Sequence, residues 1–338
     1  MQIGVVAPSS KLPMIEFRMG LDKLREAGMN PIVHPQCKKN HLFFAGTDEE
    51  RAQAFFEYAV DPRFSVVWAA RGGYGAARLL PYLEEYTAER GIPDRKLLLG
   101  YSDATALQEY VRNRWGWATM HAPMPAMRKF CVQKKDEWDS LLRFVYGGTE
   151  GKAAKAPWEK KPLKFINGAP KTPIQAELTG GNLAVWTSLI GTPFAPQSKG
   201  KMLFLEDVDE PLYRIDRMLH QLAQAGAFKE VKAILLGNFL NCRDTVARVL
   251  AVEPKDAASM KRMLNDPKPE ELKPLRKKLD ERRGLRDIFG ELGDRLGIPV
   301  AEGMPVGHGP EIAALPLGAD YRLDRRGQLR LVSWSWME

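Results

Sequence analysis

The sequence predicts an α/β fold whose first half is a parallel sheet covered by helices on both faces. Between residues 2 and 116, short apolar stretches alternate with amphipathic stretches, which is typical of βαβ units. The composition, 44% apolar and 27% charged, is that of an ordinary globular protein. After residue 147 the alternation gives way to a stretch rich in Gly, Pro, Ala and Lys, so a second unit is expected beyond it.

The expected elements of the first half follow one another without interruption. Strands are predicted at residues 2–9, 29–35, 65–70 and 96–100, and helices at residues 14–28, 48–62, 76–90 and 104–116. In such sheets ligands bind beyond the carboxyl ends of the strands. The stretches RGGYG (residues 71–75) and GYSD (residues 100–103) both lie at such ends and are therefore candidates for the functional site.

We predict three regions: an N-terminal α/β domain at residues 1–147, a linker at 148–173 and a C-terminal domain at 174–338. The C-terminal domain is expected to contain strands at residues 201–207, 231–239 and 298–303, helices at 213–226 and 285–297, and a β-rich tail. A charged insertion at about residues 253–285 interrupts it. The sequence leaves open whether this insertion is a lid, a partner surface or a solvated decoration.

Charge and cysteine content exclude several classes of protein. The net charge is +8, but the basic residues lie mostly in mixed-sign stretches such as residues 272–287, so no nucleic-acid partner is expected. Three scattered cysteines favour a reducing compartment, and the first ten residues resemble a strand rather than a signal peptide, so a cytoplasmic protein is expected. No apolar run is long enough to span a membrane. We expect neither a metal nor a cofactor, because H-E-x-x-H and clustered Cys/His ligands are missing from the sequence.

A serine and an aspartate stand where a buried strand is expected to end and a helix to begin. Ser102 and Asp103 follow the strand at residues 96–100. Gly100 and Ala104 are small, which permits the tight turn of a nucleophile elbow. The amide of Asp103, at the start of the helix, would point toward a developing oxyanion. A Ser or Asp at such a junction can also simply cap the helix, so a partner base is needed to favour catalysis.

Of the five histidines, His308 is the best candidate for that base. It lies between Gly307 and Gly309, in a stretch without helical or strand periodicity that would explain it by packing. The remaining histidines lie in the early strand and loop region, after residues 117–120, or within a predicted helix: His34, His41, His121 and His220.

Glu206 is the preferred acid to orient this base. It ends an apolar strand, where a carboxylate can be held rigidly and away from water, as a triad acid requires. Asp207, Asp209 and Glu210 compete with it, and each could instead cap the following helix. The chain order is then serine, acid, histidine, which is also the order in α/β-hydrolases.

The stretch RGGYG at residues 71–75 allows two interpretations. A strand, a Gly-rich loop and a helix could cradle phosphate, but neither common phosphate-binding glycine motif is present. We prefer the second interpretation, in which a backbone amide of this loop is the second oxyanion donor and Arg71 or Tyr74 contacts the substrate. For a carboxypeptidase, Arg71 would be the basic group that holds the terminal carboxylate.

Several motifs, in their order along the chain, resemble the LD-carboxypeptidase family of serine peptidases. The motifs are IGVVAPSS, RGGYGAARLL, LLGYSDATAL, GGNLAV, LFLEDVDEPLYRIDRML and GHGPEIAALPLGADYRLD. The resemblance covers nearly the whole chain except the linker and the charged insertion. It implies a flavodoxin-like N-terminal domain and a smaller β-rich C-terminal domain, with the active site between them.

The resemblance also implies a catalytic apparatus and a substrate. It implies a triad of Ser102, Glu206 and His308, with the amides of Gly73 and Asp103 as oxyanion hole. The implied reaction is release of the terminal D-Ala from the murein tetrapeptide L-Ala-γ-D-Glu-diaminopimelate-D-Ala during cytoplasmic cell-wall recycling. Members of the family often form homodimers, so a homodimer is expected.

Two positions depart from the family pattern, and other functions remain as alternatives. The family commonly has His-Gly-Pro where this chain has His121-Ala122-Pro123, and a larger aliphatic residue in place of Ala104. One alternative is a microcin C immunity-type serine peptidase that cleaves peptide-nucleotide antibiotics. Another is a non-catalytic protein that binds murein peptides, which would not need all three triad residues. A general α/β-hydrolase esterase is disfavoured because no HGGG-type motif is present.

Overall fold

The structure is a computed structural model that describes residues 1–147, 155–242, 256–265 and 281–337. Two of the predicted regions therefore fall partly outside the described residues. These are the linker, of which 148–154 are not described, and the charged insertion, of which 253–255 and 266–280 are not described. Within the insertion, helix α11 spans Ala257–Asn265.

Six strands form the first sheet of the described chain, in the order β11-β5-β4-β3-β1-β2. Their bounds are Gln2–Val6 (β1), Asn30–Val33 (β2), Val66–Ala69 (β3), Leu97–Gly100 (β4), Ala118–His121 (β5) and Leu315–Leu317 (β11). Strands β1 to β5 pair in parallel. The order 2-1-3-4-5 is that of flavodoxin-like folds, so the predicted fold class is confirmed.

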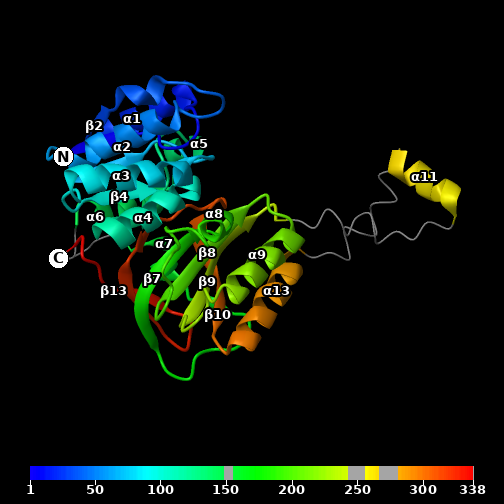
Figure 1. Cartoon of the computed structure of the whole chain (residues 1–338). Coiled ribbons are helices and arrows are strands. Elements are labelled where there is room, and N and C mark those ends of the chain that lie inside the picture. Colours follow the sequence, from blue (N-terminus) through cyan, green and yellow to red (C-terminus); the bar gives the residue numbers. More distant parts are fainter. Residues whose placement is uncertain (148–154, 243–255, 266–280, 338) are drawn as a thin grey trace.

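Helices cover both faces of this sheet (Figure 1). The bounds are Met14–Glu26 (α1), Asp48–Val60 (α2), Leu80–Arg90 (α3), Thr105–Trp115 (α4), Arg128–Cys131 (α5) and Lys135–Val145 (α6). Phe17 of α1 and Phe144 of α6 share a buried cluster with Trp68, whereas Phe55 of α2 packs on the other face with Val67. Strand residues buried on both faces explain the unbroken apolar runs in the sequence.

One expected helix begins later than predicted. Residues 76–79 form a 3₁₀ turn, Ala76–Leu79, and α3 begins only at Leu80. Pro81 lies in the first turn of α3, where its missing N–H has no cost and its fixed φ favours a helix start.

The second sheet has seven strands among the described residues, in the order β13-β12-β7-β8-β9-β10-β6. Their bounds are Lys164–Phe165 (β6), Ile174–Asn182 (β7), Met202–Val208 (β8), Ala233–Leu240 (β9), Val300–Gly307 (β10), Ala319–Leu323 (β12) and Leu329–Ser333 (β13). The four central strands β7 to β10 are parallel, and antiparallel strands lie at both edges. The bounds of the helices on one face are Leu183–Ser188 (α8), Leu212–Gln224 (α9) and Glu281–Leu296 (α13) (Figure 1).

The described part of the predicted linker, residues 155–173, packs into the second half of the chain. It contains the short helix α7 (Pro157–Lys160) and β6, which pairs with β10. The Trp158 side chain is buried, and its indole N–H donates to the carbonyl of Ala314 at 2.9 Å. The composition, rich in Gly, Pro and Lys, predicts a linker, but the burial of Trp158 attaches the segment to the core.

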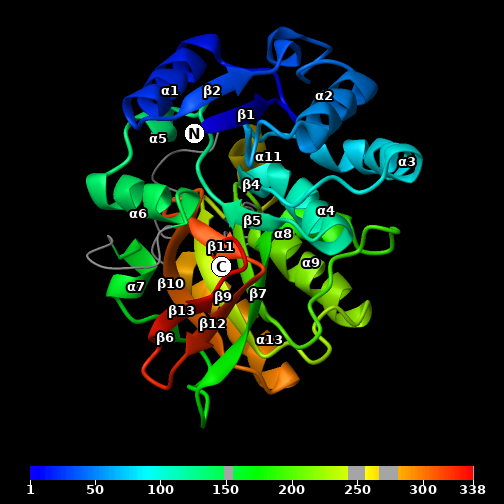
Figure 2. The same ribbon diagram turned by 90° about the vertical axis from the view of Figure 1, so that its left-hand side faces the viewer.

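The two halves of the chain share a sheet and a core. Strand β11, from the C-terminal half, pairs antiparallel with β5 at the edge of the first sheet (Figure 2). One buried cluster contains Trp68 of β3 together with Phe204 of β8 and Leu235 of β9. Because the carboxyl ends of β4 and β8 face this shared region, residues that follow these strands come together.

Candidate active site

The candidate nucleophile lies in a sharp turn after β4. Ser102 follows Tyr101 and begins a 3₁₀ turn, Ser102–Ala104, that leads into α4. Its φ is +61°, a value that non-glycine residues rarely adopt and that is typical of the strained turn of a nucleophile elbow. The small flanking residues are required, because a Cβ on Gly100 would lie 2.8 Å from the Cβ of Ala104.

Among the turn and loop hydrogen bonds of the described residues, none has the backbone amide of Gly73 or Asp103 as its donor, and the same holds for the amides of Gly72 and Ser102. The loop after β3 lies directly against the serine, since a Cβ on Gly72 would lie 3.1 Å from Ser102 Oγ. An oxyanion hole requires backbone amides that can donate to an oxygen atom of a ligand, so this cluster of amides around Ser102 is its candidate location.

The Asp103 side chain ties the neighbouring loops together. Its buried carboxylate accepts from the hydroxyl of Ser9 at 2.5 Å and from the amide of Ala76 at 2.8 Å. Burial raises the pKa of Asp103, against the lowering effect of these hydrogen bonds. Arg51, which is fully buried, donates to the carbonyl of Gly75 at 3.0 Å. The loops after β1, β3 and β4 are thus fixed around the serine.

Glu206 and His308 form a hydrogen-bonded pair. Glu206 lies near the end of β8 with no exposed surface, and His308 follows β10 directly. The Oε2 atom of Glu206 accepts from His308 Nδ1 at 2.7 Å and from the His308 backbone amide at 3.1 Å. With its proton on Nδ1, the imidazole has a free lone pair on Nε2, the form that a general base needs.

Burial and charge oppose each other at His308. Burial lowers its pKa, but the charge and hydrogen bond of Glu206, with the charge of Asp207, outweigh burial, so the pKa lies above the usual histidine value. Burial also raises the pKa of Asp207 to about 6, helped by the charge of Glu206. Asn182 Nδ2 contacts both acids, at 3.4 Å from Glu206 Oε1 and 3.0 Å from Asp207 Oδ1.

The loop that carries His308 is held from two sides. Lys129, on α5 of the first half, donates from Nζ to the carbonyls of His308, at 2.7 Å, and of Gly309. Asn238, on β9, donates to the carbonyl of Val306 at 3.1 Å. These donors fix the backbone on both sides of the histidine, so its ring has a defined position.

Tyr101 brings the serine and the histidine to the same region. Its ring centroid lies 4.8 Å from that of His308, and its backbone leads directly into Ser102. Among the described residues, Ser102 Oγ makes no hydrogen bond to His308. Such bonds are often long in enzymes without substrate and tighten when substrate binds, so the arrangement is compatible with a serine–histidine pair.

Residues 3–122 match the LD-carboxypeptidase N-terminal domain, and residues 175–323 match the LD-carboxypeptidase C-terminal domain. A Bacillus subtilis protein named "Probable murein peptide carboxypeptidase" is 31% identical over 265 residues, which are 78% of each chain. The chain belongs to the LD-carboxypeptidase family. The predicted resemblance to this family is confirmed, and because the family consists of peptidases, the chain is a peptidase family member.

Further comparisons extend over almost the whole chain. The murein tetrapeptide carboxypeptidase of Pseudomonas aeruginosa is 26% identical over 94% of this chain and 91% of its own. The crystal structure of muramoyltetrapeptide carboxypeptidase from Oxalobacter formigenes has a TM-score of 0.66 and 25% identity, covering 99% of each chain. The wild-type microcin C7 self-immunity protein MccF has a TM-score of 0.73 at 20% identity, covering 100% and 97%, which shows a shared fold.

Arg71 and Tyr74, the predicted substrate contacts of this LD-carboxypeptidase family member, lie in different surroundings. Arg71 is partly exposed, and its Nη1 donates to the carbonyl of Lys11 at 2.8 Å. Within the described residues it makes no hydrogen bond or ion pair with Ser102, Glu206 or His308. It therefore adjoins Gly72, which lies against Ser102, but is not part of the Glu206–His308 arrangement.

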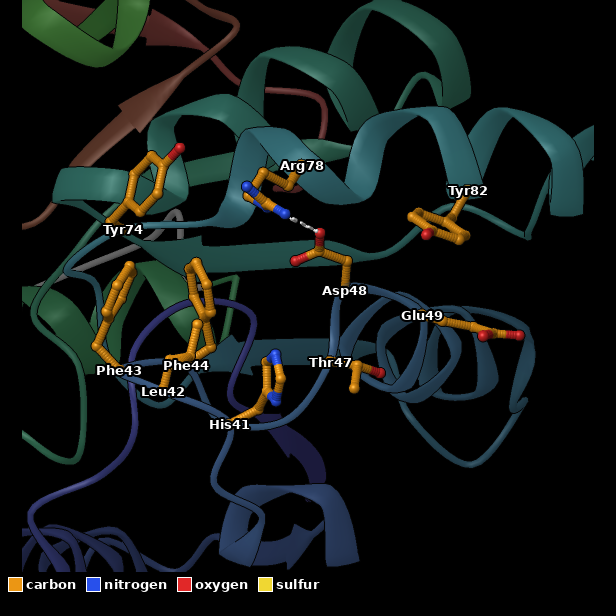
Figure 3. Close-up of a pocket in the computed structure, with 10 residues that line it drawn as sticks. All are labelled: His41, Leu42, Phe43, Phe44, Thr47, Asp48, Glu49, Tyr74, Arg78 and Tyr82. Atoms are coloured by element: carbon orange, nitrogen blue, oxygen red, sulfur yellow. Dashed lines mark hydrogen bonds and ion pairs between the residues drawn. The ribbon is translucent and has the colours of Figure 1, made fainter.

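Tyr74 lines an aromatic pocket of about 430 Å³ that is formed by residues 41–49 together with Tyr74, Arg78 and Tyr82 (Figure 3). Its ring centroid lies 6.1 Å from that of Phe43 and 5.7 Å from that of Phe44. The rings of Phe43 and Tyr74 are about half exposed. In this pocket Arg78 Nε donates to Asp48 at 2.8 Å, so these two charges are paired with each other, and Glu49 adds a further carboxylate to the lining.

Sequence reasoning did not single out several residues that complete the site. They are Ser9, Arg51, His121, Lys129, Asn182 and Asn238. Most act through contacts with residues distant in the chain, which no local spacing reveals. Asn182 is the exception, because a local signal marks it: it ends a strand within the stretch GGNLAV. Its side chain caps the following helix and accepts from the Val185 amide at 3.1 Å.

The described residues contain neither a candidate metal site nor a candidate membrane span. No group of three or more His, Cys, Asp or Glu side chains is arranged to hold a metal ion there. None of the helices described is both long and apolar enough to cross a membrane.

Proposed function

We propose that this protein is a serine LD-carboxypeptidase that releases the terminal D-Ala from murein tetrapeptide. The observation that carries the proposal is the buried Glu206–His308 pair next to the strained Ser102 turn. Membership of the LD-carboxypeptidase family supports the reaction class. The names of relatives, murein tetrapeptide carboxypeptidase among them, support the substrate.

The first step is acyl transfer to Ser102. His308 Nε2 takes the hydroxyl proton as Ser102 Oγ attacks the carbonyl carbon of the diaminopimelate–D-Ala bond. Glu206, held at 2.7 Å from Nδ1, keeps the imidazole in the required tautomer and stabilises the imidazolium that forms. The strained φ of Ser102 keeps its hydroxyl directed away from the sheet.

The tetrahedral intermediate needs donors for its negative oxygen. We assign this role to the amides of Gly73 and Asp103, neither of which is a donor in the turn and loop hydrogen bonds of the described residues. His308 then gives its proton to the nitrogen of the departing D-Ala, which leaves an acyl-enzyme. Water, deprotonated by His308, hydrolyses this ester and restores the serine.

Recognition of the substrate requires a group that binds a free carboxylate. Arg71 is the proposed group, since it is partly exposed next to the serine loop and its guanidinium has donors beyond the one bound to Lys11. Tyr74 is proposed to contact the rest of the peptide from the aromatic pocket. The cytoplasm as the site of action, a role in cell-wall recycling and a homodimeric assembly remain part of the same proposal.

A second candidate is cleavage of peptide-nucleotide antibiotics, as the name of one relative suggests. The Escherichia coli microcin C7 self-immunity protein MccF is 24% identical over 94% of this chain and 88% of its own. The half-exposed rings of Phe43 and Tyr74 favour this candidate, because a nucleobase stacks on aromatic side chains. Both candidates use the same three residues and differ only in what the pocket holds.

The deciding experiment is mass spectrometry of L-Ala-γ-D-Glu-meso-diaminopimelate-D-Ala incubated with the wild type and with Ser102→Ala. We expect the wild type to remove one alanine and Ser102→Ala to be at least about 1,000-fold slower, since loss of a nucleophile removes most catalysis. The matched control is Ser188→Ala, an exposed serine on α8, which should keep wild-type activity.

Each other outcome has a clear meaning. Tetrapeptide left whole by the folded wild type contradicts the murein assignment, and peptide-nucleotide substrates are then tested with the same variants. Loss of alanine with both the wild type and Ser102→Ala keeps the function and removes Ser102 from it.

A further inference from the structure

A second histidine faces the candidate triad acid from the other sheet. His121 is the last residue of β5, and only 1% of its surface is exposed. Its ring lies between those of Tyr101, at a centroid distance of 5.3 Å, and Phe204, at 5.2 Å. The Nε2 atom lies 3.8 Å from Glu206 Oε1 and has no hydrogen-bond partner within the described residues.

The two oxygens of Glu206 are unequally satisfied. Oε2 accepts two hydrogen bonds from His308, at 2.7 and 3.1 Å. Among the described residues, Oε1 has a single donor, Asn182 Nδ2, at the long distance of 3.4 Å. A carboxylate has roughly four acceptor sites, and leaving one oxygen nearly unpaired in a buried site is costly. The unpartnered nitrogen of His121 is thus next to the oxygen that lacks a donor.

The charge state of His121 determines what it can offer. Complete burial lowers its pKa to about 4, with the charge of Glu206 raising it and that of His308 lowering it. At neutral pH the ring is therefore uncharged and carries one N–H. Only the tautomer with the proton on Nε2 avoids directing a lone pair at the carboxylate, so Nε2 is a donor here.

We propose that His121 is a positioning residue, which donates from Nε2 to Oε1 of Glu206 and thereby keeps Oε2 on His308. The proposal rests on the proposed function in assigning Glu206 and His308 their roles. An approach of about 0.8 Å brings the present 3.8 Å to ~3.0 Å, an ordinary N–H···O distance. Catalytic hydrogen bonds commonly tighten in this way when substrate binds.

The place of His121 in the fold suits this role. In the parallel register of β4 and β5 it lies opposite Gly100, two residues before Ser102. Glu206 belongs to β8 of the second sheet. One side chain on β5, the strand next to the one that leads into the nucleophile, thus lies against the acid that orients the base.

Removing the donor has a consequence that a merely structural residue does not share. Without the donor on His121 the negative charge on Glu206 is less stabilised by hydrogen bonds, so Glu206 attracts the proton of His308 more strongly and the pKa of His308 rises further. The titratable groups that face His121 are Glu206 from β8, His308 from its loop and Tyr101 from the serine turn, with Asp207 beyond Glu206.

The test compares two donor-free variants, His121→Phe and His121→Met, with His121→Gln, whose amide can still donate. The control is His220→Phe, since His220 is exposed on α9. The first readout is NMR titration of His308 in protein labelled with ¹⁵N-histidine, which needs no substrate. The second is the rate at which a fluorophosphonate labels Ser102 at pH 7, and the third is kcat and KM on the murein tetrapeptide.

We expect the donor-free variants to raise the His308 midpoint by about half a pH unit or more. Labelling and kcat should fall about 10- to 100-fold with KM changed less than about threefold, because only the orientation of the base is affected. His121→Gln should recover most of both, and His220→Phe should match the wild type.

The proposal is overturned by a folded donor-free variant with an unshifted His308 midpoint and unchanged labelling. It is also overturned when Ser102 of His121→Gln is labelled as slowly as that of His121→Phe and neither variant shifts the His308 midpoint. A third contrary result is that both donor-free variants fail to fold while labelling of His121→Gln stays impaired. Those results describe a residue needed only for packing. Failure of the proposed function is distinct: the wild type then leaves the tetrapeptide whole while the titration and labelling effects persist.

Discussion

Glu206 accepts hydrogen bonds from His308 and Asn182, and this contact determines the properties of His308. The acid has no exposed surface, and two of its hydrogen bonds come from the ring and backbone of a single residue, His308. In a buried site an ionised acid raises the proton affinity of the imidazole that it contacts. The geometry therefore sets both the orientation and the pH range of the proposed base.

The first prediction at this scale concerns pH. A general base must be neutral, so kcat/KM is expected to fall as pH falls through a midpoint above the ordinary histidine value of about 6.5. The raised pKa of His308 gives this sign. Because the charge of Asp207 contributes to that rise, Asp207→Asn should move the midpoint to lower pH. The measurement is the pH profile of kcat/KM for both proteins.

The same titration affects stability with the opposite sign. The pKa of His308 is higher in the folded state, so its contribution to stability is complete below the unfolded pKa and is lost as pH rises through the folded pKa. Activity should therefore appear over the pH range in which this contribution is lost. A midpoint below that of free histidine would contradict the assignment of His308 as a base paired with Glu206.

At the scale of elements, the three proposed catalytic residues all lie at or near the carboxyl ends of strands. Strand β4 ends before Ser102, β8 contains Glu206 near its end, and β10 ends at Gly307 before His308. Gly307 lies so close to the acid that a Cβ there would be 2.5 Å from Glu206 Oε2, and its φ is +106°. The glycine allows β10 to bring His308 directly against Glu206.

Strand β10 provides a matched pair of variants. Gly307→Ala places a methyl group against Glu206, so we expect kcat to fall at least about 100-fold, as displacements of about 1 Å at a site commonly produce. Gly303 of the same strand also has positive φ, +102°, but a Cβ there meets nothing within 4 Å. Gly303→Ala should therefore show a similar backbone cost, about 1–3 kcal/mol, with near wild-type kcat.

The measurements are thermal or urea unfolding and kcat on the tetrapeptide for both variants. Equal loss of kcat in Gly303→Ala and Gly307→Ala would mean that strain in β10, rather than contact with Glu206, controls activity. A fully active Gly307→Ala would mean that the observed Glu206–His308 contact is not needed.

At the scale of the whole molecule, the site exists because the two halves of the chain are joined. Strand β11 of the C-terminal half completes the first sheet, and α5 of the N-terminal half reaches the His308 loop through Lys129. The Lys129 ammonium donates hydrogen bonds to the carbonyls of His308 and Gly309. A substitution of Lys129 should therefore alter the position of the His308 ring although Lys129 contacts only the backbone of that loop.

Lys129→Met is expected to cost about 1–3 kcal/mol of stability, because a charged donor is lost from two partly buried carbonyls. We also expect kcat to fall about 10-fold as the His308 loop loosens. The control is Lys134→Met, which breaks the exposed ion pair with Glu311 between the same two regions. That pair should be worth at most about 1 kcal/mol, and its loss should leave kcat within about twofold.

Unfolding experiments and steady-state kinetics on the two lysine variants test this expectation. Equal losses of stability and kcat in Lys129→Met and Lys134→Met would show that any contact between the two halves has the same effect, and that the hydrogen bonds to the His308 loop have no specific role. Unchanged kcat in a Lys129→Met protein of lowered stability would show that the carbonyl bonds serve the fold and leave the base undisturbed.

The sequence alone determined the α/β class, the parallel first sheet and the residues of interest at strand ends. These depend on local signals: apolar runs of strand length, helical periodicity, and small residues such as Gly100 and Ala104 that permit a tight turn. Loops rich in glycine, at residues 71–75 and around His308, were identifiable for the same reason. Each signal lies within about ten residues and survives without knowledge of the rest of the chain.

Only the tertiary structure decided which of these residues meet. Glu206 and His308 are 102 residues apart, and their contact depends on the parallel order of β8, β9 and β10. His121 reaches Glu206 because two different sheets face each other, and Trp158 is buried in a segment whose composition predicts a linker. Packing between distant segments is a property of the whole fold, and no local pattern encodes it.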